Sequence, residues 1–111
     1  MPTLFTKIIN GDIPADIVYQ DEHVVAFRDI DPKAPVHVLI VTRAEIEGLA
    51  SLPDQGDHTH ILNAAKRIAE QEGIAEGGYR LVINQGQDGG QTVAHLHAHL
   101  LGGRAFSWPP G

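Results

Sequence analysis

The sequence predicts an α+β fold, with an antiparallel sheet of about five strands, one short helix and one long helix. Three observations support this prediction. A chain of 111 residues fits a single domain, so residues 1–111 are taken as one unit. Two segments carry apolar residues at helical spacing. Five short segments have strand character, and the first two are separated only by a brief polar turn, which favours a hairpin.

The N-terminal quarter predicts the short helix and the hairpin. Thr3 to Asn10 has apolar residues at helical spacing, and Gly11 ends the segment. The strands of the hairpin are Ile17–Tyr19 and Val24–Phe27, and they flank the polar residues Asp21 to His23.

The middle of the chain predicts a loop, a buried strand and the long helix. Asp29 to Pro35 contains two prolines and is expected to be a loop. Val36 to Val41 is apolar except for His37, which is typical of a strand that is buried on both faces. Pro53 suits the first turn of the long helix, and Gly73 ends it. Its apolar stripe consists of Ile61, Ala64, Ala65, Ile68 and Ala69.

The C-terminal part predicts two further strands, Leu81–Ile83 and His95–Leu101, joined through a glycine-rich loop at Gly86 to Gly90. The tail from Trp108 to Gly111 contains two prolines and cannot continue a sheet or a helix.

Charge and composition exclude several classes of protein. The net charge of −6 argues against binding to nucleic acid or to an anionic membrane, because both need a basic surface. The chain has no cysteine, which excludes disulfides, thiolate metal sites and a cysteine nucleophile. No apolar run is long enough to span a bilayer, and the N-terminus lacks the layout of a signal peptide. We therefore expect a cytoplasmic protein with no membrane or nucleic-acid partner.

Three of the seven histidines, His95, His97 and His99, alternate with apolar residues in one predicted strand. Side chains two residues apart share a strand face, so the three imidazoles should point one way and Leu96, Ala98 and Leu100 into the core. One interpretation is a solvated face that carries histidines by chance. A second is a metal site, but His95 and His99 would lie about 13 Å apart along the strand, too far for one ion. The third is catalysis, in which a neutral imidazole attacks phosphorus and a neighbouring imidazole moves a proton.

The surrounding residues favour the catalytic interpretation. The glycine-rich loop, Gln91 and Thr92 directly precede the histidines, and such a loop can turn backbone N–H groups toward a phosphate. His37 is the single polar residue of its strand and is a candidate fourth member of the site. Asn84 ends another strand, where its amide could contact a ligand. The remaining histidines are expected at the surface: His23, His58 and His60.

The segment from His95 to Leu101 resembles the signature of the histidine-triad superfamily, and the resemblance extends over almost the whole chain. Further segments resemble the Hint branch of that superfamily. They are residues Phe5–Ala15, Ala26–Ile30, Ala34–His37, Asp88–Val93, Gly102–Arg104 and Trp108–Gly111.

The resemblance implies a homodimer whose subunits join their sheets, and a hydrolase that cleaves the P–N bond of purine nucleoside 5′-phosphoramidates without a metal or other cofactor. It implies that His97 is the nucleophile and that His99 contacts the phosphate and helps to protonate the leaving amine. His37 and His95 would then orient the nucleophile. The implied nucleotide contacts are Asp29 for ribose, Asn84 and Thr92 for the phosphate region, and Phe5, Ile8, Ile13, Phe27 and Ile30 for the base; Gly90 and Gln91 are further candidates from the loop.

Two features bear on specificity. Thr92 stands where many Hint proteins have serine, so the hydroxyl is kept and the added methyl restricts χ1. Trp108, four residues from the end, is expected to pack against something, either the partner near its active site or the core edge of its own subunit. Three alternatives remain open from sequence: a dinucleoside polyphosphate hydrolase of the Fhit branch, a nucleotide-binding regulatory module with weak catalysis, and a zinc-binding protein.

Overall fold

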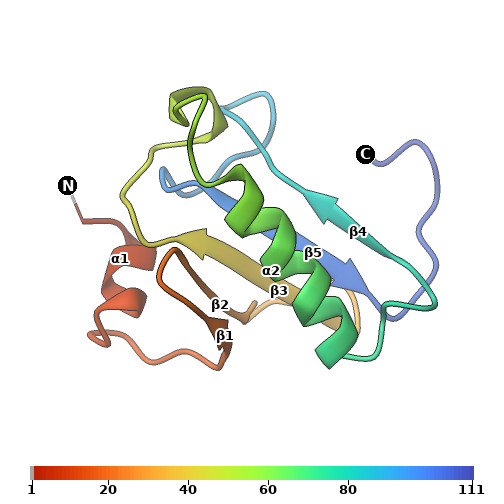
Figure 1. The fold of residues 1–111 in the computed structure, drawn as a ribbon. Helices are drawn as coiled ribbons and strands as arrows, with labels where there is room; N and C mark the ends of the chain where they lie inside the picture. The colour runs from red at the N-terminus through yellow and green to blue at the C-terminus, as the bar shows by residue number, and fades with distance from the viewer. Residues whose placement is uncertain (1) are drawn as a thin grey trace.

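Five strands form one antiparallel sheet in the order β1-β2-β3-β5-β4, as Figure 1 shows. The structure is a computed structural model that describes residues 2–111. β3 and β5 are neighbours at the middle of the sheet although they are far apart in sequence. The strands are β1 Ile17–Gln20, β2 Val24–Arg28, β3 Val36–Thr42, β4 Tyr79–Val82 and β5 His97–Gly102. The predicted α+β class and the five-stranded antiparallel sheet are confirmed.

The two predicted helices lie on opposite sides of this sheet. α1 (Leu4–Ile9) begins with a capping box, in which the Thr3 and Thr6 side chains each accept a hydrogen bond from the other residue's backbone N–H. α2 (His58–Gln71) runs across the other face, over β3 and β5 in Figure 1. A short 3₁₀ helix, η1 (Leu49–Ser51), was not predicted.

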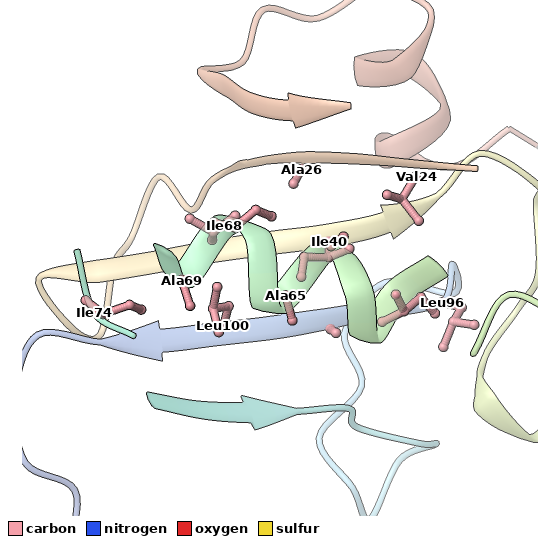
Figure 2. Close-up of a cluster of buried hydrophobic side chains, with 13 residues drawn as sticks. Val24, Ala26, Ile40, Ala65, Ile68, Ala69, Ile74, Leu96 and Leu100 are labelled. Atoms are coloured by element: carbon pink, nitrogen blue, oxygen red, sulfur yellow. The ribbon is translucent and has the colours of Figure 1, made fainter. Parts of the chain in front are cut away.

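The sheet separates two apolar clusters, because successive side chains of each strand point to opposite faces. On one face α2 packs with its predicted stripe against Val24, Ala26, Ile40 and Leu100, as Figure 2 shows. On the other face a smaller cluster gathers beneath α1. Its buried members are Phe5, Ile8, Val25, Phe27, Leu39 and Val41.

Three predicted elements begin two or more residues away from their predicted starts. α2 begins at His58 and not near Pro53, because residues 53–57 form a turn before the helix. The last strand begins at His97 and not at His95. β3 ends at Thr42, and the N–H of Leu96 donates to the carbonyl of Ile46 at 2.7 Å outside the sheet, so His95 has no strand partner. β4 occupies Tyr79–Val82 instead of Leu81–Ile83.

The tail does not close the core of its own subunit. Trp108 is 81% exposed, which contradicts the alternative that it seals the core edge. Among residues 2–111, none of the helices combines the length and the apolar character that crossing a bilayer requires.

Candidate active site

The central strand pair β3 and β5 places the imidazoles of His37, His97 and His99 on the face beneath α1. In the register of this pair, Leu39 lies opposite His99 and Val41 lies opposite His97. Ala98 and Leu100 of β5 belong to the cluster under α2, so the predicted division of faces is confirmed within β5, whereas His95 lies before the strand. The centroids of the His97 and His99 rings are 5.1 Å apart, and those of His37 and His99 are 5.2 Å apart.

His97 is held with one specific nitrogen free. Its Nδ1 lies 2.6 Å from the carbonyl oxygen of His95. A carbonyl only accepts, so Nδ1 carries the hydrogen and Nε2 keeps its lone pair in the neutral ring. The ring is 6% exposed and meets the edge of Phe5 at a centroid distance of 4.9 Å. Burial lowers the pKa of His97, although the bond to the His95 carbonyl opposes that shift. His97 therefore presents a neutral nucleophilic nitrogen near pH 7.

His95 is fully buried and anchors the loop before β5. Its Nε2–H donates to the carbonyl oxygen of Thr42 at 2.7 Å, so its Nδ1 accepts from the hydroxyl of Thr3 at 2.7 Å. The hydroxyl of Thr6 in turn donates to Glu45 at 2.6 Å. The carbonyl of His95, which accepts the hydrogen bond from His97 Nδ1, is thus held in place by contacts that extend to Thr3, the N-cap of α1.

His37 and His99 form a pair whose tautomers are set by the backbone. The N–H of Lys33 donates to His37 Nδ1 at 3.0 Å, so the hydrogen of neutral His37 sits on Nε2. That Nε2–H donates to Nδ1 of His99 at 3.0 Å, which leaves the hydrogen of His99 on Nε2. Burial lowers the pKa of His99 to about 4, helped by the nearby rings of His97 and His37. Burial also lowers the pKa of His37.

Asp29 lies beside this pair. Its Oδ2 is 3.4 Å from Nε2 of His37, and its Oδ1 accepts from the N–H of Asp31 at 2.9 Å. The negative charge of Asp29 opposes the lowering of the pKa values of His37, His97 and His99. Ligand atoms of Asp29, His37 and His99 lie within 4.8 Å of one another, so these three could hold a metal ion. Both nitrogens of His37 are already hydrogen bonded, however, so an ion would have to displace this network.

A cavity of about 300 Å³ opens between α1, the end of β2 and the histidines. Its walls include His97, His99, Asp29 and Thr92. All five residues predicted for the base line it, although Ile30 is fully exposed to solvent. Leu39 also lines the cavity, and its alternation with His37 on β3 could have revealed it. The other lining residues missed from sequence are Leu4, Pro14, Ala15, Arg28 and Val93.

The remaining predicted residues lie around two neighbouring hollows. Asn84 lines a hollow of about 470 Å³ together with Asp29, His37, Thr92 and His99.

Gly90 and Gln91 line a different hollow, of about 550 Å³, and Thr92 is on the wall of all three. The N–H groups of Gly90 and Gln91 donate to carbonyls of their own loop at 3.1 and 3.0 Å. The amide group of Gln91 also bonds the backbone of Gly86, Glu47 and Val93. These two residues therefore shape the loop that carries Thr92, and their donors are already engaged.

The chain is similar to known HIT proteins in both sequence and structure. The HIT domain model matches residues 10–106. A purine nucleoside phosphoramidase from Escherichia coli K12 is 51% identical over 104 residues, covering 92% of this chain and 87% of that protein. A 14 kDa zinc-binding protein from Zea mays is 51% identical, with 99% of this chain and 88% of that protein covered. The crystal structure of a HIT family hydrolase from Legionella pneumophila superimposes with a TM-score of 0.93 at 49% identity, over 97% of this chain and 98% of that one.

Proposed function

Because this chain belongs to the HIT family, we propose that it hydrolyses purine nucleoside 5′-phosphoramidates through a covalent nucleotidyl intermediate on His97. One observation carries the proposal: the His95 carbonyl fixes the hydrogen of His97 on Nδ1, beside a cavity of about 300 Å³. The lone pair on Nε2 is then the nucleophile, because Nδ1 is committed to the carbonyl.

In the first step, Nε2 of His97 attacks phosphorus, and the bond between phosphorus and the leaving nitrogen breaks. As the anionic substrate binds, Nδ1 of His99 takes up one proton, and the Nε2–H of His37 then donates to Oδ2 of Asp29, 3.4 Å away, instead of to His99. The phosphate and the carboxylate of Asp29 both favour positive charge there. Cationic His99 gives the proton on its Nε2 to the leaving nitrogen, which departs as a neutral amine, and the ring of His99 becomes neutral.

In the second step, water attacks phosphorus and the bond between phosphorus and His97 Nε2 breaks. The water gives one proton to Nε2 of His99, and the nucleoside monophosphate is released. The His37–His99 pair loses the extra proton to solvent when the product leaves, which restores the neutral rings.

The binding roles follow from the walls of the cavity. Its apolar walls, which include Phe5, Ile8 and Phe27, suit a flat purine ring. Asp29 accepts hydrogen bonds from the ribose hydroxyls. Thr92, which lines both this cavity and the neighbouring hollow, and Asn84, which lines that hollow beside His99, contact the phosphate and the leaving group.

Turnover of adenosine 5′-phosphoramidate by wild type, His97→Ala and His58→Ala tests this proposal. His97→Ala should lose at least about 10³-fold in kcat while nucleotide binding largely survives. His58→Ala, which removes an exposed histidine, should match wild type. A nucleotidyl group trapped on His97 with a slow-leaving substrate supports the covalent route. Near-normal turnover by His97→Ala, or a strong preference for a diadenosine polyphosphate, would contradict the proposal.

The proposed active form is a homodimer that joins two sheets at β4. Among the described residues, β4 pairs only with β5, so its outer edge is open to a second copy. Tyr79 on β4 is 40% exposed, and the tail beyond β5 carries the exposed Trp108. Sedimentation equilibrium should give twice the mass of one chain. A single-chain mass at high protein concentration would contradict the dimer.

A further inference from the structure

A second group of metal-ligating side chains lies where the β1–β2 turn meets the beginning of α2. It consists of His23, Asp57 and His60, which we call the turn–helix cluster. One ligand atom from each residue lies within 4.8 Å of the others. Nδ1 of His23 is 3.9 Å from Oδ1 of Asp57, and the rings of His23 and His60 stack with centroids 3.5 Å apart at 8°. The proposed reaction uses none of these residues.

The backbone that carries His23 is fixed before any ion binds. Oδ1 of Asp21 accepts from the N–H groups of His23 at 2.8 Å and Val24 at 2.9 Å. The carbonyl of His23 accepts from the N–H of Arg43 at 2.9 Å. The other two members belong to α2, since Asp57 is its N-cap and His60 lies in its first turn. Two rigid segments therefore hold the three side chains close together, which reduces the ordering that binding requires.

The side chains of the cluster can be reached from solvent, and the carboxylate of Asp57 is not used as a helix cap. Asp57 stands at the N-cap position, yet its carboxylate makes no capping hydrogen bond. The side chains of His23 and Asp57 are 42% and 21% exposed, so a cation can reach the cluster from solvent.

We propose that the turn–helix cluster binds one divalent transition-metal ion, with Zn²⁺ as the best match. Two imidazoles and one carboxylate suit zinc, and nitrogen ligands disfavour Mg²⁺ and Ca²⁺. Metal–ligand bonds near 2 Å bring ligand atoms to about 3.3 Å apart, so the 3.9 Å separation of His23 and Asp57 needs only a small closure. The stacked rings must open so that both lone pairs converge on the ion. Water completes the coordination.

The ion would connect the β1–β2 turn to α2, which is a structural role. α2 covers the sheet face opposite His97, so the metal would not take part in the proposed hydrolysis. The carboxylate of Asp57 offsets the partial positive charge at the beginning of α2, which would otherwise disfavour a cation. The inference stands independently of the proposed function.

Titration of the whole protein with Co²⁺ and Zn²⁺ tests the site. Co²⁺ should give visible absorption bands of a nitrogen- and oxygen-ligated ion, and Zn²⁺ should displace it. His23→Asn, Asp57→Asn and His60→Gln should each weaken binding at least about tenfold. His58→Gln, on the same helical turn but outside the cluster, is the matched control. Zn²⁺ at a hundred times its Kd should raise the Tm of wild type by about 10 °C and should not do so for His60→Gln.

The number of metal ions bound per chain distinguishes the turn–helix cluster from the other potential metal group, Asp29, His37 and His99. If both groups bind, His60→Gln should lose one equivalent of metal and keep the other. The proposal is overturned if His60→Gln binds Co²⁺ and Zn²⁺ with wild-type affinity and stoichiometry. It is also overturned if wild type shows no binding at millimolar Zn²⁺, in which case the stacked histidines are a packing contact alone.

Discussion

Acidification from pH 7 to pH 5 should destabilise the fold through His99. Burial lowers the pKa of this ring from 6.5 to about 4. Between these two values the unfolded chain binds more protons at this position than the folded chain does. The free energy of unfolding therefore rises with pH in this window, and it falls as the pH drops from 6.5 toward 4.

The magnitude follows from the two protonation equilibria. At pH 5, a ring with a pKa of 6.5 is about 97% protonated, whereas one with a pKa near 4 is about 9% protonated. Linkage then gives a loss of about 2 kcal/mol between pH 7 and pH 5. His99 is only partly buried, and solvent screening reduces this contribution to about 1 kcal/mol.

Urea unfolding of wild type and His99→Gln at pH 7 and pH 5, at one protein concentration, measures the effect. Wild type should lose about 1 kcal/mol more than His99→Gln over this interval. His58→Gln serves as a control that removes an exposed histidine. The ring signals of His99 in NMR spectra should not titrate until the pH falls below 5. Equal losses for wild type and His99→Gln, or a His99 titration near pH 6.5, would refute the reasoning.

Three further outcomes are expected. Thr3→Val removes the N-cap of α1 and the hydroxyl that donates to His95, so urea unfolding should show that the free energy of unfolding falls by about 1–2 kcal/mol. Thr3→Ser should recover most of this loss, and an unchanged unfolding midpoint for Thr3→Val would contradict the assigned contacts. If Asp29 binds ribose, 2′-deoxy and 3′-deoxy substrates should have a lower kcat/KM than the ribose substrate, and Asp29→Ala should narrow that difference. If Asp29→Ala instead lowers kcat/KM equally for all three sugars, Asp29 has only a structural role. Deletion of residues 108–111 should reduce kcat/KM for bulky leaving groups more than for a bare phosphoramidate, and an equal reduction for both would remove the tail from substrate selection.

The alternation of residues 95–101 was sufficient to predict which side of the sheet carries the imidazoles. It separates imidazoles from apolar residues in the sequence itself, and the two clusters of the structure follow the same division. His37 was predicted as a member of the site for a similar reason, since a single polar residue stands out in an apolar strand, and its ring contacts His99.

Other features depended on contacts that no local pattern contains. The hydrogen bond between Thr3 and His95 joins residues 92 positions apart. The tautomer of His37 is set by the backbone N–H of Lys33, a group that every residue except proline carries. His23 and His60 were predicted as separate surface residues, and only the packing of α2 against the sheet brings their rings together.

The position of β3 and β5 at the middle of the sheet has a consequence for hydrogen exchange. Amides in these strands exchange only when the sheet itself opens, because each strand is paired on both sides. The backbone around His99, which lies opposite Leu39 on β3 and Val82 on β4, should therefore be among the slowest to exchange. α1, with six residues at the periphery, has few hydrogen bonds to break and should exchange much faster. The wall that α1 forms and the strands that carry the imidazoles thus belong to cooperative units of different stability, so the wall of the cavity can move while the imidazoles stay in place.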